Sequence, residues 1–257
     1  MNRTPSPYQG VVRAMLSATL ILSVGHAASA QGNMQQRTSD YPFGFQAYGV
    51  FRSMITERNY RPVVRLKDAF AGATDAVGAV TGLRGEISMI EGRPIVSYGI
   101  ECAKACPAVT TESATLLATA SVKDWRSISI DRELDAKATE VFIREQARAN
   151  GLDEAKPFPF RVHGAITDFV MHVNAAPNPR FSGHGSFDEM AITGLAKGPR
   201  LAGYVVGFYA PPALQGVITH MGDFFHSHFV DQERKGTAHL DTFGIAAGST
   251  LFLPAQN

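Results

Sequence analysis

The chain has 257 residues, of which 45% are hydrophobic and 18% are charged, and its formal net charge is +1. This is the composition of a globular protein with room for one large domain or two small ones. The small net charge and the lack of any run of Lys or Arg argue against a nucleic-acid partner or an anionic membrane surface.

The first thirty residues have the pattern of a secretory signal peptide. Arg3 and Arg13 give a positive start, residues 14–24 form an apolar run, and residues 28–30 (Ala-Ser-Ala) supply the small side chains that a signal peptidase needs. Cleavage after Ala30 would leave a mature protein in the periplasm or outside the cell, with no further membrane contact. The alternative is an uncleaved anchor, although a spanning helix needs about 20 apolar residues.

The N-terminal part, residues 31–155, mixes helix and strand patterns. Cys102 and Cys106 are its two cysteines, and in an oxidising compartment they favour a small structural disulfide. Two reduced thiols are the alternative. Small residues and glycines dominate residues 73–82 and predict a tightly packed or turning backbone. The predicted elements are a helix over 45–59, a hairpin over 85–99 that turns at Glu91-Gly92-Arg93, a strand over 113–122 and a helix over 131–151.

The helix over 131–151 is predicted from its ends and from one apolar face. Asp131 is the expected N-cap and Gly151 the expected C-terminal stop. The apolar residues that share one face at helical spacing are Leu134, Ala138, Val141 and Phe142. We expect this helix to cover a sheet or to link two sheets.

The C-terminal part, residues 156–257, is β-rich. Short apolar runs separated by Gly, Pro and Asn turns predict strands over 158–173, 201–210 and 248–254, and further strands in the segment 224–241. Helices and strands together place the chain in the α/β (α+β) class.

Three of the eight histidines lie within fourteen residues: His226, His228 and His239. Side chains alternate faces along a strand, so the first two point the same way. A hairpin turn symmetric about the Glu233–Arg234 bond would pair His228 with His239, with their Cβ atoms about 4.5–5.5 Å apart. A β-bulge would shift this register.

Three neutral imidazoles around one point favour Zn²⁺ or another divalent first-row metal. The alternative is three separate histidines in a polar groove. The sequence contains no nucleophile elbow, P-loop or dinucleotide fingerprint that would indicate other chemistry.

The histidine segment resembles that of the α-acetolactate decarboxylases. Their pattern of His-x-His, then Glu/Asp and Arg, then a return strand with His-x-Leu-Asp is matched by residues 226–228, 233–234 and 239–241. Residues 82–92 (GLRGEISMIEG) and 158–166 (FPFRVHGAI) resemble two further strands of the family. The resemblance therefore covers most of the mature chain, in patches.

The resemblance implies a mixed N-terminal sheet and a barrel-like C-terminal part. It also implies zinc bound by the three histidines, and Glu86 as a carboxylate that reaches the metal. The family holds its substrate with an arginine on the strand after Gly164, where this sequence has His172. His220, in a local insertion, is a second candidate to replace that arginine. A further glutamate in the family's C-terminal segment has no evident counterpart in residues 240–257.

Three functions remain open from the sequence. The first is a lyase that converts 2-acetolactate, a 2-hydroxy-3-keto acid, to acetoin and CO₂ with Glu86 and His172 as catalytic residues. The second is an exported metal-dependent lyase or hydrolase of the same fold with another substrate. The third is a non-catalytic metal-binding protein. The expected partners are a small anionic molecule and a second copy of the chain in a homodimer.

Overall fold

The structure, a computed structural model, describes residues 41–99, 111–184 and 187–256. The predicted signal peptide and the predicted disulfide between Cys102 and Cys106 lie outside the described residues. Within those residues, no helix is both long and apolar enough to cross a membrane.

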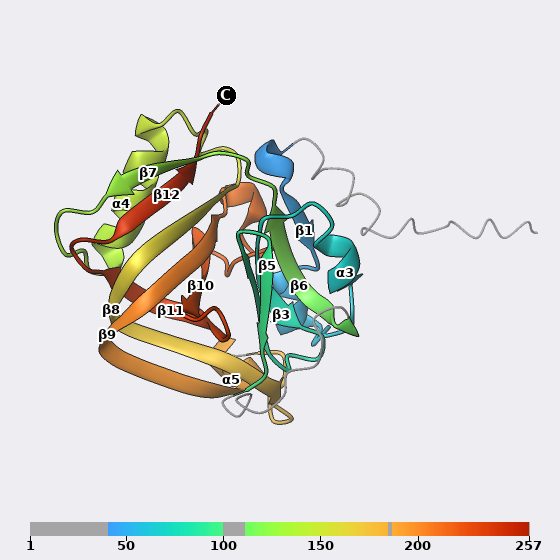
Figure 1. Cartoon of the computed structure of the whole chain (residues 1–257). Coiled ribbons are helices and arrows are strands. Elements are labelled where there is room, and N and C mark those ends of the chain that lie inside the picture. Colours follow the sequence, from blue (N-terminus) through green and yellow to red (C-terminus); the bar gives the residue numbers. More distant parts are fainter. Residues whose placement is uncertain (1–40, 100–110, 185–186, 257) are drawn as a thin grey trace, which may run out of the picture.

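The first of two antiparallel sheets has the strand order β1-β6-β3-β4-β5, and β2 pairs with β6. It lies on the right of Figure 1, with α3 beside it. Its strands are β1 (Gln46–Tyr48), β2 (Val64–Arg65), β3 (Asp75–Val80), β4 (Glu86–Ile90), β5 (Arg93–Ser97) and β6 (Ser113–Ala120). The helices of this part are η2 (Pro42–Gly44), α2 (Phe51–Thr56) and α3 (Leu66–Ala69).

The second sheet has the strand order β11-β10-β9-β8-β12-β7, and β11 also pairs with β8. Because β11 pairs with both β10 and β8, the strands from β8 to β11 close into a small barrel, as the family resemblance implied. The strands are β7 (Trp125–Ser129), β8 (Phe158–Pro177), β9 (Ala191–Tyr209), β10 (Phe225–Asp231), β11 (Thr237–Ile245) and β12 (Thr250–Pro254). The helices are α4 (Ala136–Ala149), α5 (Phe187–Met190) and η4 (Pro212–Leu214).

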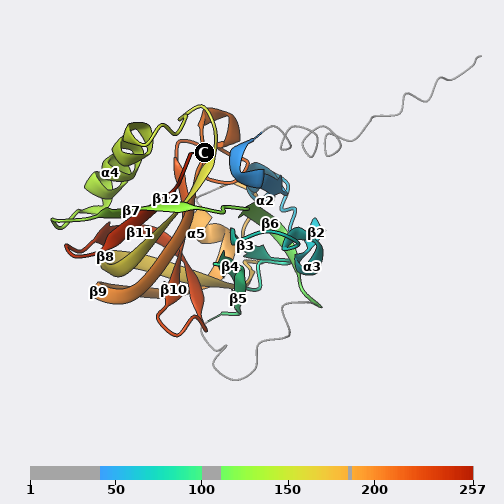
Figure 2. The same ribbon diagram turned by 45° about the horizontal axis from the view of Figure 1, so that its top comes forward.

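The α+β class is confirmed, since antiparallel strands dominate and helices are few. Helix α4 lies against the second sheet, where Ile143 and Ala147 join the barrel core (Figure 2). β7 and α4 therefore belong with the C-terminal strands, although both precede residue 156. The sheet boundary lies between Ala120 and Trp125.

The two sheets pack face to face through apolar side chains of both. Alternate residues of β4 show how this works, because Ile90 faces the second sheet, whereas Ile87 and Met89 pack on the α3 side. Other residues of the shared core are Val77, Ala118, Val206, Phe208 and Val230. Glu86 and Ser88 follow the same alternation as Ile90 and so face the second sheet.

The predicted hairpin over 85–99 is confirmed as β4 and β5. Its turn residues Glu91 and Gly92 have φ angles of 53° and 73°, and positive φ at both central positions suits the twist of a tight hairpin. The strand predicted over 113–122 is confirmed as β6, and the C-terminal strands are confirmed as β8, β9 and β12.

The helix predicted over 45–59 is wrong in extent. Residues 46–48 form β1, and only 51–56 are helical. Gly49, with φ at 79°, separates the two elements. Residues 73–82 contain a buried central strand, β3, rather than a turn. Its Gly78 lets a neighbouring strand come close, since a Cβ there would lie 2.1 Å from the carbonyl oxygen of Leu116.

The predicted start of the long helix is also wrong. Asp135, not Asp131, caps α4, because its Oδ1 accepts a hydrogen bond from the backbone N–H of Ala138 at 2.7 Å. Leu134 lies outside the helix in an isolated bridge with Ile245. The predicted end is confirmed by Gly151, which has φ at 81°.

The buried face of α4 differs from the predicted one by about one position. Val141 is 47% exposed, while Ala138 and Phe142 are only partly buried against the core. The buried residues are Thr139, Ile143 and Ala147.

A buried ion pair joins the two sheets at one end of their interface. Asp75 of β3 accepts hydrogen bonds from Nε (2.5 Å) and Nη2 (2.8 Å) of Arg161 in β8. The guanidinium also lies 4.1 Å from the centre of the Trp125 ring. Asp75 is fully buried and Arg161 is 8% exposed, so each charge needs a partner in place of water. Glu91 lies farther from the guanidinium, with its Oε1 3.7 Å from Nη1.

Asp75→Ala should lower the free energy of unfolding by about 3–5 kcal/mol, because it leaves the buried Arg161 charge without the carboxylate that binds it through two hydrogen bonds. Urea denaturation followed by circular dichroism would measure this loss. Asp131→Ala is the control, since that side chain is 84% exposed and its loss should change stability by no more than about 0.5 kcal/mol. Equal stability of the two variants would show that the ion pair does not hold the sheets together.

Candidate metal centre

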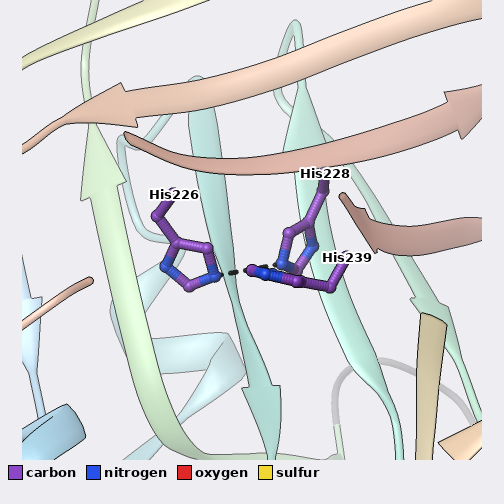
Figure 3. Close-up of side chains that lie close together, drawn as sticks. All are labelled: His226, His228 and His239. Atoms are coloured by element: carbon purple, nitrogen blue, oxygen red, sulfur yellow. Dashed lines mark hydrogen bonds between the residues drawn. The ribbon is translucent and has the colours of Figure 1, made fainter. Parts of the chain in front are cut away.

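Three imidazole rings from one hairpin meet on the face of the second sheet that packs against the first (Figure 3). His226 and His228 lie on β10, and His239 lies opposite His228 on β11. The ring centroids are 5.0, 5.1 and 5.3 Å apart, a nearly equilateral triangle. The register predicted from the turn is confirmed.

The nitrogens of these rings are arranged to fit one metal ion. One nitrogen from each ring lies within 4.8 Å of the others, and Nε2 of His226 lies 3.2 Å from Nε2 of His228. Nitrogens bound to one tetrahedral zinc at its usual bond length lie about 3.3 Å apart. The three side chains could therefore hold a divalent metal with little movement.

Burial keeps the three rings neutral, as metal binding requires. It lowers the pKa of His226 to about 4, although a backbone hydrogen bond with Ile218 acts in the opposite direction. Burial is also the main reason that the pKa values of His228 and His239 lie well below the ordinary histidine value, and neighbouring histidines lower both further. Each ring therefore has a lone pair to offer at neutral pH.

Glu86 reaches the histidines from β4 of the first sheet. It is 2% exposed, and its Oε2 lies 3.7 Å from Nε2 of His228. Its Oε1 accepts hydrogen bonds from the backbone N–H (3.1 Å) and from Nδ2 (2.5 Å) of Asn174. Burial raises the pKa of Glu86 to about 7, while His172 and Asn174 act to lower it. This carboxyl group can therefore accept or release a proton near neutral pH.

His172 lies on β8 directly opposite His239, with the two ring centroids 4.9 Å apart. Its Nδ1 is 2.8 and 3.0 Å from the two carboxylate oxygens of Asp241. An ionised carboxylate only accepts hydrogen bonds, so Nδ1 must carry the proton. Any positive charge on His172 is thus balanced by the Asp241 carboxylate beside it.

A cavity of about 290 Å³ opens beside His226 and His239. Its lining includes residues of α4, β10 and β11 and of the segment before β10. The acidic side chains in this lining are Glu140, Asp223 and Asp241, and among the described residues no Lys or Arg lines it. A ligand in the cavity would meet carboxylates, and positive charge could come only from a metal ion or a histidine.

His220 lines the same cavity, and its ring lies 4.3 Å from that of Phe51. The structure therefore brings both histidines that could replace the family's arginine close to the triangle. They occupy different positions, because His172 lies on β8 beside Asp241, whereas His220 lies in the loop before β10.

No role was predicted from the sequence for the side chains that hold these groups: Ser88 contacts His228, Asn174 contacts Glu86, and Asp241 contacts His172. Each of them stands two residues after a predicted site residue on the same strand. The pairs are Glu86 and Ser88, His172 and Asn174, and His239 and Asp241. Residues two apart on a regular strand share a face, so the alternation that linked His226 to His228 was also the signal for Ser88 and Asn174. Asp241 lies at a register shift of β11 between Leu240 and Thr242, so alternation alone does not place it.

The protein-family model for alpha-acetolactate decarboxylase matches residues 53–256. The fold is similar to that of alpha-acetolactate decarboxylase from Bacillus subtilis strain 168, with a TM-score of 0.66 and 13% identity over 83% of this chain and 86% of that chain. For acetolactate decarboxylase from Bacillus subtilis subspecies spizizenii the TM-score is 0.64 and the identity 14%, over 83% and 86% of the two chains.

A Staphylococcus aureus protein of unknown function, described as similar to alpha-acetolactate decarboxylase, has a TM-score of 0.61 and 15% identity, over 81% of this chain and 84% of that chain. No curated protein matches the chain. At these identities, the likeness to solved structures shows the fold.

Replacing any one of the three histidines of the triangle by Ala should remove most of the bound metal, because two neutral nitrogens alone make a weak site. Elemental analysis of the purified variants against the wild type would measure this. His163→Ala is the control, since His163 is exposed and stacks on Tyr204. A variant lacking all three histidines that still held one metal ion per chain would place the metal elsewhere.

Proposed function

The chain belongs to the alpha-acetolactate decarboxylase family, and from this premise we propose that it is a metal-dependent lyase that converts 2-acetolactate to acetoin and CO₂. The observation that carries the proposal is the triangle of neutral histidines with a buried carboxyl group 3.7 Å from one of them. A purely structural metal site has no need of a carboxyl group whose pKa is close to 7.

We propose His226, His228 and His239 as the ligands of a Zn²⁺ or another divalent first-row ion. When bound there, such an ion would act as a Lewis acid that stabilises negative charge on the oxygens of a 2-hydroxy-3-keto acid. Three neutral ligands leave the ion its full double positive charge, which suits an anionic substrate in a cavity lined by carboxylates.

Glu86 is proposed as the group that moves protons. Its Oε1 is held by Asn174, so Oε2, which faces His228, is the atom that exchanges a proton with the substrate. Its pKa of about 7 allows both directions of transfer near neutral pH. Burial excludes bulk water from this carboxyl group, so its proton passes to the substrate rather than to solvent.

His172 is proposed to act in place of the family's arginine by attracting the substrate carboxylate when its ring is protonated. Asp241 accepts the hydrogen bond from Nδ1 and so orients the ring. Asp241 takes the hydrogen bond from Nδ1, so at most one ring nitrogen can meet a substrate carboxylate, whereas a guanidinium can bind it through two hydrogen bonds. We therefore expect weak binding of the substrate carboxylate.

Glu86→Gln should lower the rate of acetoin formation by about 100-fold or more, because an amide cannot exchange the proton. Metal content should stay unchanged, since the amide keeps the size of the side chain. Kinetic assay on 2-acetolactate together with metal analysis would separate the two effects. Glu57→Gln, on an exposed residue, is the control, and a Glu86→Gln variant with wild-type turnover would remove Glu86 from the mechanism.

A second candidate keeps the metal and the fold but acts on another substrate, as an exported lyase or hydrolase. Two observations favour it: the pairing of His172 with Asp241, and the acidic lining of the cavity. Both weaken the hold on a carboxylate substrate compared with an arginine at the same position.

His172→Arg should raise kcat/KM for acetolactate, since a guanidinium keeps its charge and can bind a carboxylate through two hydrogen bonds. Acetoin formation by the metal-loaded enzyme would measure the change, with His163→Arg as the control on an exposed strand position. If the metal-loaded wild type and His172→Arg both failed to turn over any 2-hydroxy-3-keto acid, the second candidate would take the place of the first.

A further inference from the structure

A chain of buried hydroxyl groups leads to the far side of the His228 ring. Oγ of Ser88 lies 3.1 Å from Nδ1 of His228 and 2.6 Å from Oγ1 of Thr237. The Thr237 hydroxyl in turn lies 2.9 Å from the backbone carbonyl oxygen of Phe229. Ser88 and His228 are fully buried, and Thr237 is 4% exposed.

The carbonyl at the end of this chain determines the direction of its hydrogen bonds. A carbonyl oxygen can only accept, so the single hydroxyl proton of Thr237 points to Phe229. The 2.6 Å contact is then made by the proton of Ser88, which Thr237 accepts. Ser88 has no proton left for His228, so Nδ1 of the ring must be the donor. The ring also makes a backbone hydrogen bond with Ile87, the residue before Ser88.

If the hydrogen bonds ran in the opposite direction, from Thr237 through Ser88 to His228, one of the three contacts would have no proton. If Thr237 donated to Ser88 and Ser88 to Nδ1, the Thr237 and Phe229 oxygens would face each other at 2.9 Å as two acceptors. Burial makes such an unmade hydrogen bond costly. Only the direction that ends on Phe229 satisfies all three contacts.

We infer that Ser88 and Thr237 are positioning residues that hold His228 as the tautomer protonated on Nδ1. Its Nε2 then carries the lone pair and faces Nε2 of His226, 3.2 Å away, at the centre of the triangle. This inference rests on the proposed function in one respect, because the proposed function supplies the metal that the Nε2 lone pair would bind. The preference for one tautomer belongs to the protein without metal.

The chain of hydroxyl groups formed by Ser88 and Thr237 also links the two sheets at the site. Ser88 comes from β4, and Thr237 begins β11, where its backbone N–H donates to Oγ of Ser97 at 2.8 Å. The ring of His228 is thus oriented by the first sheet, although its backbone belongs to the second. Groups outside the ligands that fix the tautomer of a metal-binding histidine typically change metal affinity by about 10–100-fold when they are removed.

The test is the tautomer of His228 in metal-free, ¹⁵N-labelled protein, observed through the two ring-nitrogen shifts. Wild type should show the proton on Nδ1. Thr237→Val keeps the shape of the side chain but lets the Ser88 hydroxyl turn toward Nδ1, so the proton should shift toward Nε2. Thr237→Ser should restore the wild-type spectrum. Thr115→Val is the matched control, because that buried hydroxyl has no hydrogen-bond partner among the described residues.

Zinc titration of the same proteins gives a second measurement. Thr237→Val should bind zinc about 10-fold or more weakly than wild type, whereas Thr237→Ser and Thr115→Val should bind like wild type. Thr237→Ala, which removes the same hydroxyl, should show the same shift toward Nε2, so the test does not depend on the folding of one variant.

Protonation on Nε2 in the wild type, or an unchanged spectrum in both Thr237→Val and Thr237→Ala, would overturn the inference. The spectrum is independent of catalysis. A protein that shows the predicted tautomers but forms no acetoin would refute the proposed function and support the role of Ser88 and Thr237 in positioning His228.

Discussion

The packing of two sheets against each other is the constraint on which the candidate centre depends. The histidines lie on the second sheet, whereas the carboxyl group and the hydroxyl that contact His228 lie on the first. Neither sheet alone could bury these polar groups with their partners. The same burial that keeps the imidazoles neutral raises the pKa of Glu86 to about 7. One structural fact therefore sets the protonation states of both kinds of group.

Local patterns in the sequence predicted the part of the site that is local in the chain. The alternation of side chains and a turn centred between Glu233 and Arg234 were enough to pair His228 with His239. The hairpin of β4 and β5 was predicted for the same reason, since a tight turn determines its own register. Glu86 was placed through the family resemblance, and the structure brings it to the histidines.

Contacts between residues far apart in the chain could not be predicted in this way. Asp75 and Arg161 are 86 residues apart, and Ser88 and His228 are 140 residues apart. The apolar pattern of one strand shows which of its faces is buried, but not which residues of the other sheet pack against that face. The errors in the helices are of another kind, because Asp131 and Asp135 are equally good caps in sequence and only the bridge of Leu134 with Ile245 decides between them.

The three proposed ligands come from one hairpin, whereas the groups that would meet a substrate come from β4, β8, α4 and the loop before β10. The two sets occupy separate segments of the chain. The two sets touch where β8 pairs with β11, because His172 lies opposite His239 and its Nδ1 bonds to Asp241 of the hairpin. The His172 side chain therefore acts on the hairpin through the Asp241 carboxylate, and not through the turn that sets the register of β10 and β11.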